Sequence, residues 1–448
     1  MKIAIPRGLA DGALPFGAAT VIFLSFIFGG STQQGFWSDA IIQLASLGLL
    51  GLALVSFKNI PRDALILVCV LVALPILQLI PMPPTLWTLL PDREALAKGY
   101  EAANVSLPWL PISVAPSVTF HSFTSLLPGV ALFLAALQLS NNWRRNLVLI
   151  VFAILIASVI LDLLQMMQGQ ASLLRFYATT NVDRAVGFFA NSNHNAAFLY
   201  SAIPLGAAFW VGFRHQPQQR LLLAPLLLVV VIGLSLAQSR AGLILGLIAG
   251  LCCILLVVWN GNGMGQRRLW MGVLGVNVLA LFLAFQFGFV GFEKRMQDSD
   301  ILGDLRWPVA SVTVKVAGAN LPFGSGFGTF VPAYQMAEPR LLLLERFVNR
   351  AHNDWLEFWL EGGIFSVLGL VVFIGWFLPA VTRVWKAEST AGSSLAITLA
   401  RASSIVIALL LVHSTIDYPL RTTSLLILFS LACALLISRN DTSPRPVQ

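Results

Sequence analysis

Apolar residues occur along this chain in long uninterrupted runs rather than in alternation with polar residues. The runs cover about 14–29, 37–57, 64–80, 121–139, 146–167, 193–213, 221–237, 243–259, 269–290, 355–378, 402–417 and 420–437. Most approach the roughly 20 residues that a helix needs to cross a bilayer, whereas strands of a membrane barrel alternate. The pattern therefore predicts an all-α polytopic membrane protein with about 12 transmembrane helices.

Composition agrees with this pattern and excludes a soluble multidomain protein. Hydrophobic residues make up 57% of the chain and charged residues 11%, against about 25% charged in soluble domains. The formal charge of +8 comes from basic residues dispersed over the loops, without the basic stripe that nucleic-acid binding needs. The four cysteines lie inside apolar runs without metal or disulfide spacing. We therefore expect no nucleic-acid partner, no metal and no cofactor.

The distribution of basic residues predicts the orientation of the chain. With the amino terminus in the cytoplasm, almost every short inner loop carries basic residues, such as the pair Arg144 and Arg145, as the positive-inside rule requires. The first apolar run lacks a small-residue cleavage site, so we interpret it as a retained helix rather than a signal peptide. Both termini are therefore predicted to be cytoplasmic.

Polar residues concentrate in three outer segments. These are a Pro-rich segment at about 81–117, a shorter loop at about 169–191, and the largest at about 291–354, between the ninth and tenth predicted helices. We interpret residues 1–448 as a single membrane domain carrying this large loop. The chemistry is expected on the outer face.

The large loop ends in a group of polar residues directly ahead of an apolar run. It contains Arg350, His352 and Asn353, followed by Asp354 and Glu357. A histidine titrates near pH 6.5, which suits proton transfer at neutral pH, so His352 is the candidate base. On a continuous helix, Asp354 and Glu357 lie about 200° and 140° away from it. Neither carboxylate is therefore an assured partner, and a metal site is disfavoured.

Two outer arginines are candidates for binding an anion. Arg240 lies in a short turn between two apolar runs, where it either reaches the interface or provides a fixed cation in an outer cavity. Arg306 precedes Trp307 and is either a phosphate clamp or half of a surface ion pair. The glycine-rich stretch 322–330 lacks the strand–turn–helix context of a nucleotide-binding loop, so a tight turn is predicted there.

Two further outer turns leave alternatives open. Arg184 and His194 flank a segment rich in Asn and Ser, which helix capping explains in large part. Together they are either a donor pair near an anion or, for His194, a hydrogen-bonded residue at a helix start. In the last outer turn, Asp417 and Arg421 either neutralise each other or orient a catalytic group.

These outer segments together resemble the O-antigen ligase and polymerase superfamily of bacterial glycan-assembly enzymes. The resemblance rests on Ser239-Arg240, the loop from Arg184 to Asn193, Arg306-Trp307, the 322–330 turn and the segment 350–353, in this order on one face. It covers the chain from about residue 170 to the end. In the first half, only the hydropathy and the Pro-rich loop match.

The resemblance implies a GT-C-type glycosyltransferase in the bacterial inner membrane, with undecaprenyl-diphosphate-linked glycan as donor and a periplasmic active site. Ligases of this superfamily use lipid A core as acceptor, polymerases extend O-antigen or exopolysaccharide, and oligosaccharyltransferases glycosylate protein. No metal is required if arginines supply the positive charge at the leaving diphosphate. We assign this role to Arg240 and Arg306, with Arg184 and Arg421 as weaker candidates. The supporting residues are Arg350, Asn353, Asp417 and His194.

Two other classes of protein compete with this interpretation. A transporter or lipid-linked glycan flippase predicts charges at mid-membrane depth and an internal pseudo-repeat. A scaffold protein of the envelope leaves His352 dispensable. Neither the concentration of charges in one outer loop nor the absence of a visible repeat favours a transporter.

Overall fold

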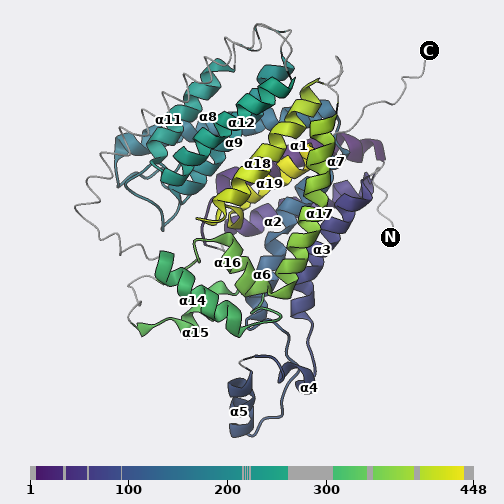
Figure 1. Cartoon of the computed structure of the whole chain (residues 1–448), viewed down its shortest axis with the longest axis vertical. Helices are drawn as coiled ribbons and strands as arrows, with labels where there is room; N and C mark the ends of the chain where they lie inside the picture. The colour runs from purple at the N-terminus through teal and green to yellow at the C-terminus, as the bar shows by residue number, and fades with distance from the viewer. Residues whose placement is uncertain are drawn as a thin grey trace.

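The computed structural model describes residues 7–33, 37–57, 60–91, 93–213, 223–260, 306–340, 347–387 and 394–437, with 216, 218 and 220. The described chain is helical (Figure 1). Its elements are α1 (Arg7–Phe28), α2 (Trp37–Val55), α3 (Arg62–Leu79), α4 (Pro84–Trp87), α5 (Glu94–Ala102), α6 (Pro116–Ser125), α7 (Leu127–Gln138), α8 (Asn141–Gln168), α9 (Ser192–Gly212), α11 (Ala224–Ala237), α12 (Arg240–Asn260), α14 (Arg306–Ala319), α15 (Phe330–Ala337), α16 (Asp354–Gly362), α17 (Ile364–Lys386), α18 (Ser394–His413), the 3₁₀ turn η3 (Pro419–Arg421) and α19 (Thr423–Leu436).

Within the described ranges, eight helical segments are long and apolar enough to cross a membrane. They are α2, α3, α6 with α7, α8, α9, α12, α17 and α18, and three shorter apolar helices lie in α1, α11 and α19. The all-helical membrane fold is thus confirmed. The predicted ninth run, about 269–290, lies outside the described residues, so the total of 12 and the GT-C architecture stay predictions.

The predicted run 355–378 is not one helix, and this part of the prediction was wrong. Helix α16 ends at Gly362, and α17 begins at Ile364. Between them, Gly363 has φ of 50°, in the left-handed region that favours glycine. The N–H of Ile364 donates to the carbonyl of Pro322 at 2.7 Å, so a loop distant in sequence packs against the joint. Tertiary contact therefore interrupts a segment whose composition favours a continuous helix.

The helix ends opposite the large loop are held together by buried arginines. Arg144 donates to the carbonyl of Leu137 at 3.0 Å and to that of Ile437 at 2.7 Å. Arg401 donates to the carbonyl of Val384 at 2.9 Å. Carbonyl groups at helix carboxyl ends lack intrahelical partners and carry partial negative charge. Arg144, which the sequence predicts on the inner side, and Arg401 therefore cap α7, α17 and α19.

The other end of the bundle, called here the site end, is where α9, α12, α17 and α19 begin. Short helices α4, α5, α14, α15 and α16 lie at this end, at the bottom of the view (Figure 1). Buried Gln78, at the end of α3, donates to the carbonyls of Phe323 at 3.0 Å and Glu361 at 2.9 Å. It also accepts from the N–H of Phe327 at 2.8 Å. One membrane helix thus fixes the glycine-rich turn and α16 together.

The glycine-rich turn is a packing element, which gives a first prediction. Gly324 has φ of 75°, and a Cβ there would meet the backbone of Glu361. We expect Gly324→Ala to lower the unfolding midpoint in detergent, because it combines backbone strain with a steric clash. Gly318→Ala, in α14 with open space around its Cβ, should raise the midpoint slightly. Equal midpoints for the two variants would contradict this assignment.

Candidate active site

His352 lies just before α16, outside any helix. Its φ of 50° places it in the left-handed region, which a non-glycine residue adopts only when its surroundings hold it there. The next residue, Asn353, is the N-cap of α16, and its side-chain oxygen accepts from the N–H groups of Trp355 and Leu356 at 3.0 Å each. The assumption that a helix continues through His352 was therefore wrong.

The partner of His352 is Asp417, in the turn between α18 and α19. The Nδ1 atom of His352 lies 3.4 Å from Oδ1 of Asp417, an ion-pair distance when the ring is protonated. Asp417 is buried, whereas a third of the His352 side chain is exposed. The ring of Tyr418 packs edge-on against His352, with ring centroids 5.1 Å apart. The imidazole thus contacts both Asp417 and Tyr418 while a third of the side chain stays exposed.

The carboxyl group of Asp417 is kept ionised by this environment. Burial acts to raise its pKa, but contact with His352 and the proximity of His194 and His413 outweigh burial. The pKa of Asp417 therefore lies well below its usual range. A buried carboxylate beside an accessible imidazole stabilises the imidazolium that forms on proton uptake.

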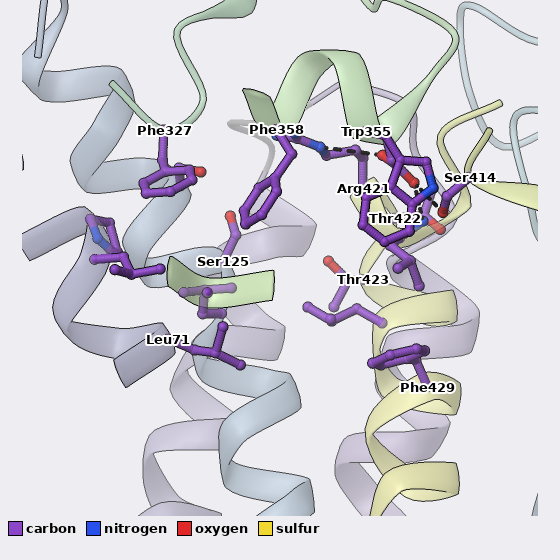
Figure 2. Close-up of a pocket in the computed structure, with 18 of the residues that line it drawn as sticks. Leu71, Ser125, Phe327, Trp355, Phe358, Ser414, Arg421, Thr422, Thr423 and Phe429 are labelled. Carbon is purple, nitrogen blue, oxygen red and sulfur yellow. Dashed lines mark hydrogen bonds and ion pairs between the residues drawn. The ribbon is translucent and has the colours of Figure 1, made fainter. Parts of the chain in front are cut away.

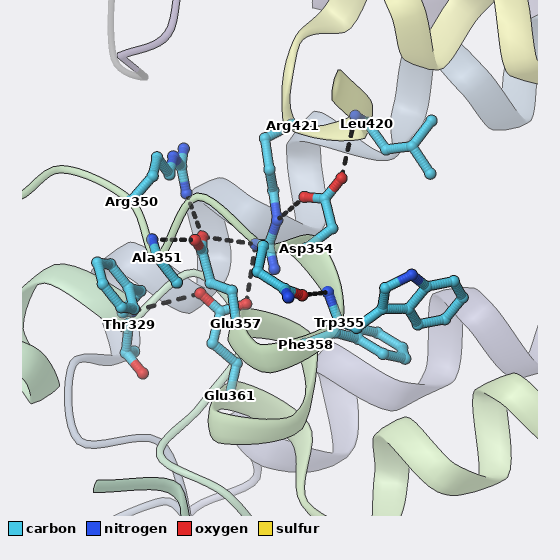
Figure 3. Close-up of polar contacts among 12 residues, drawn as sticks. Thr329, Arg350, Ala351, Asp354, Trp355, Glu357, Phe358, Glu361, Leu420 and Arg421 are labelled. Atoms are coloured by element: carbon cyan, nitrogen blue, oxygen red, sulfur yellow. Dashed lines mark hydrogen bonds and ion pairs between the residues drawn. The ribbon is translucent and has the colours of Figure 1, made fainter. Parts of the chain in front are cut away.

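Arg421 pairs with other carboxylates than Asp417, so mutual neutralisation, one of the two alternatives left open for this turn, does not apply. Arg421 instead lies among the three acidic residues of α16 (Figure 3). Its guanidinium nitrogens lie 3.4 Å from Asp354, 3.4 Å from Glu357 and 2.9 Å from Glu361. Asp354 and Glu357 are therefore not partners of His352, as expected. The reason is their pairing with Arg421 and not their angular positions on a helix, because no helix continues through His352.

Arg350 completes this group, which we call the carboxylate cluster: Arg350, Asp354, Glu357, Glu361 and Arg421. Arg350 Nη1 donates to Glu357 at 2.7 Å. Burial raises the pKa of Asp354 to about 7 despite the nearby Arg421. For Glu357, burial is outweighed by Arg421 and Arg350, and its pKa is lowered. With two arginines and three carboxyl groups, the cluster is neutral when one carboxyl is protonated.

An apolar cavity of about 300 Å³ lies beside the carboxylate cluster (Figure 2). Leu71, Phe358 and Phe429 contribute to its wall, from α3, α16 and α19. Asp354 and Arg421 form part of its polar end. The lining includes Ser414 and Arg421 from the turn 414–422, which also carries Asp417. The same turn therefore serves the cavity and His352.

The remaining predicted site residues lie at the site end in different settings. Arg240 and Arg306 are exposed at the first positions of α12 and α14. The charge of Arg306 acts on His413, at the end of α18. Arg184 is half-buried, and its Nε lies 3.5 Å from the carboxylate of neighbouring Asp183.

His194 does not match the hydrogen-bonded role considered for it, and its role near an anion stays a prediction. It is fully buried, and its ring packs edge-on against Tyr418 with centroids 4.9 Å apart. Neither ring nitrogen has a hydrogen-bond partner among the residues that the structure describes. His194 is therefore a packing residue beneath Tyr418, not a hydrogen-bonded residue at a helix start.

Sequence reasoning missed Asn193 as a site residue. It attributed the asparagines of this segment to capping, and Asn191 is indeed the N-cap of α9. The Asn193 side chain instead donates to Asp417 Oδ2 at 2.7 Å, across 224 residues of sequence. Because Asn191 already suffices as the cap, the presence of a second asparagine at position 193 was a signal that it has another role. The sequence alone does not identify Asp417 as its partner.

Comparison with known families supports the resemblance that the motifs suggested. The family model of the O-antigen ligases matches residues 225–374. The match includes Arg240, Arg306 and His352 but ends before Asp417. A comparison with curated proteins finds no match. With the ordered motifs and the helical membrane fold, the matched segment supports the similarity of this chain to the O-antigen ligase and polymerase superfamily.

Proposed function

We propose that this protein is a membrane glycosyltransferase that moves a glycan from undecaprenyl diphosphate to an acceptor hydroxyl at the periplasmic face. The observation that carries the proposal is the pairing of accessible His352 with buried Asp417 at 3.4 Å, at the site end of the bundle. His352 takes the proton of the attacking hydroxyl, and Asp417 stabilises the resulting imidazolium.

The leaving diphosphate needs positive charge, which we assign to Arg240 and Arg306. Both are exposed at the starts of helices, and helix amino termini themselves favour anions. Charge-assisted hydrogen bonds from guanidinium groups fit phosphate oxygens. Since arginines supply this charge, we expect transfer to continue in the presence of a chelator of divalent cations.

Arg421 has a different role in this proposal from the one its position in the sequence suggested. Three buried carboxyl groups lie within 3.4 Å of its guanidinium nitrogens, so little of its charge is left for a phosphate. We assign Arg421 and Arg350 to holding α16 in place. Arg184, already close to Asp183, remains the weaker phosphate candidate.

The apolar cavity supports a lipid-linked substrate. A wall of aliphatic and aromatic side chains fits a hydrocarbon chain, and the cavity's polar end lies on the turn that carries Asp417. An envelope scaffold protein has no need for this arrangement. The cavity and its polar end favour an enzyme whose substrate enters from the bilayer and places its headgroup near His352.

The direct test is transfer by the purified protein in lipid nanodiscs, with undecaprenyl-diphosphate glycan as donor. Lipid A core is the first acceptor to test, because ligation is the reaction proposed. Polymer formation from the donor alone indicates a polymerase, and glycosylated protein indicates an oligosaccharyltransferase. We expect Arg240→Ala and Arg306→Ala each to lower the rate by about 10² to 10³. Arg383→Ala, an exposed arginine in the last turn of α17, is the matched control.

Two results would overturn the proposal. One is wild-type rates from both the Arg240→Ala and Arg306→Ala proteins. The other is movement of the donor across vesicle membranes with no transfer to any of the three acceptors, which is the result expected of a flippase. Deleting the gene tests the acceptor in the cell: lipopolysaccharide without its glycan indicates ligation, and polymer shortened to single repeats indicates polymerisation.

A further inference from the structure

The side chain of Asn193 connects three segments of the site end that are far apart in sequence. Its Nδ2 donates to Asp417 Oδ2 at 2.7 Å, in the turn between α18 and α19. Its Oδ1 accepts from Ser239 Oγ at 2.8 Å, directly before Arg240. Asn193 itself lies in the first turn of α9. One carboxamide therefore joins the starts of α9 and α12 to the carboxylate that faces His352.

The orientation of this carboxamide is determined by its neighbours. Ser239 Oγ accepts from the N–H of Gly242 at 3.0 Å and donates its own proton to Asn193 Oδ1 at 2.8 Å. Asn193 must then present its oxygen to Ser239 and its NH₂ group to Asp417, since an ionised carboxylate only accepts hydrogen bonds. Rotating the amide by 180° would place two acceptors against each other at Asp417.

Because of the hydrogen bond from Asn193, the two carboxylate oxygens of Asp417 have different contacts. Oδ2 is held by Asn193 at 2.7 Å, and Oδ1 faces His352 Nδ1 at 3.4 Å. With one oxygen fixed, the carboxylate cannot rotate freely about its last bond. Asn193 is also not needed to cap its own helix, because Asn191 already accepts from the N–H of Asn193 at 2.9 Å.

We propose that Asn193 is a positioning residue: it holds Asp417 in line with His352 and ties this pair to the start of α12, which carries Arg240. The proposal rests on the proposed function, in which His352 is the base. It gives a physical reason why the proton acceptor and the assigned diphosphate arginine keep a fixed spacing. A misplacement of about 1 Å at a catalytic site can cost about 100-fold in rate.

Other titratable groups also face the Asp417–His352 pair, and the test must account for them. They are His194 on α9, His413 on α18 and Tyr418 in the turn, with the charges of Arg350 and Arg306 nearby. A variant at Asn193 leaves all five in place. A change in the pH profile of that variant therefore reports on the carboxylate that Asn193 holds.

The experiment compares Asn193→Ala with the wild type in the nanodisc assay across pH 5 to 9. We expect kcat to fall about 10-fold to 100-fold with KM for the donor nearly unchanged. The pH profile should also change, because Asp417 loses a hydrogen bond that favours its ionised form, and its pKa rises. Combining Asn193→Ala with Asp417→Asn should add little to Asp417→Asn alone.

Asn181→Ala is the matched control. Asn181 Oδ1 accepts from the N–H of Ser192 at 2.9 Å, so it also supports the start of α9, but it donates nothing to Asp417. A purely structural role for Asn193 would make both variants lose folded protein alike, with unchanged pH profiles. Measuring the unfolding midpoint of each variant separates this outcome from altered chemistry.

The outcomes distinguish this proposal from the function on which it rests. If the wild type transfers no glycan, the proposed function fails. If the wild type is active and His352→Asn is inactive, but Asn193→Ala keeps the wild-type rate and pH profile, only the role of Asn193 fails. Full additivity of Asn193→Ala with Asp417→Asn would also overturn the positioning role.

Discussion

Replacing His352 with asparagine is expected to lower glycan transfer by about 10² to 10⁴, the contribution typical of a general base. Asparagine tolerates the left-handed backbone better than most residues, so the φ of 50° at this position should be retained. The amide cannot take up the proton of the acceptor hydroxyl. Initial rates in nanodiscs, at equal amounts of folded protein, measure the effect.

His121→Asn provides the matched control for this substitution. His121 is exposed on α6, which also lies toward the site end of the molecule (Figure 1). We expect this variant to keep the wild-type rate. Transfer by His352→Asn at more than a tenth of the wild-type rate would remove His352 from the role of base, because general-base catalysis contributes more than that.

Replacing Arg421 with methionine is expected to destabilise the protein by about 3–5 kcal/mol, the cost typical of removing one partner from a buried ionic group. The side chains of Glu357 and Glu361 are fully buried, and that of Asp354 nearly so. Without Arg421, Arg350 is the only cation left in the cluster. Unfolding in detergent, followed by circular dichroism against denaturant, measures the loss.

Two further variants make this prediction specific. Arg383→Met removes an ion pair with Asp63, whose two side chains are 62% and 44% exposed, and should cost less than about 1 kcal/mol. Asp354→Asn should recover part of the loss in the Arg421→Met protein, because it removes one carboxyl group that burial already disfavours. Equal stabilities of Arg421→Met and Arg383→Met would instead indicate that Arg421 is available to bind a ligand.

The membrane helices were predictable from the sequence because a helix that crosses a bilayer needs a continuous apolar segment, which is a property of the local sequence. Each of eleven predicted runs coincides with described helices, in whole or in part. The exception in detail is 355–378, where composition favours continuity but the loop carrying Pro322 packs against Gly363. The helix propensity of residues 355–378 does not predict a contact with a loop about 40 positions away in the sequence.

The candidate site was predictable in its residue types but not in its pairing. His352, Arg350 and the acidic residues of α16 were recognisable as an unusual polar group ahead of an apolar run. Their partners, Asp417 and Arg421, come from a turn about 60 residues later. Which acid pairs with which base depends on how α16 packs against that turn, and helical periodicity does not contain this information.

The break at Gly363 has a mechanical consequence. Long membrane helices adapt to bilayers of different thickness by tilting, and α17, with a largely exposed apolar surface, is free to do so. The helical hydrogen-bond pattern is interrupted at Ile364, whose N–H donates to the carbonyl of Pro322 in a distant loop. We therefore expect the joint at Gly363 to let α17 tilt with a smaller displacement of α16 and His352 than one continuous helix would impose.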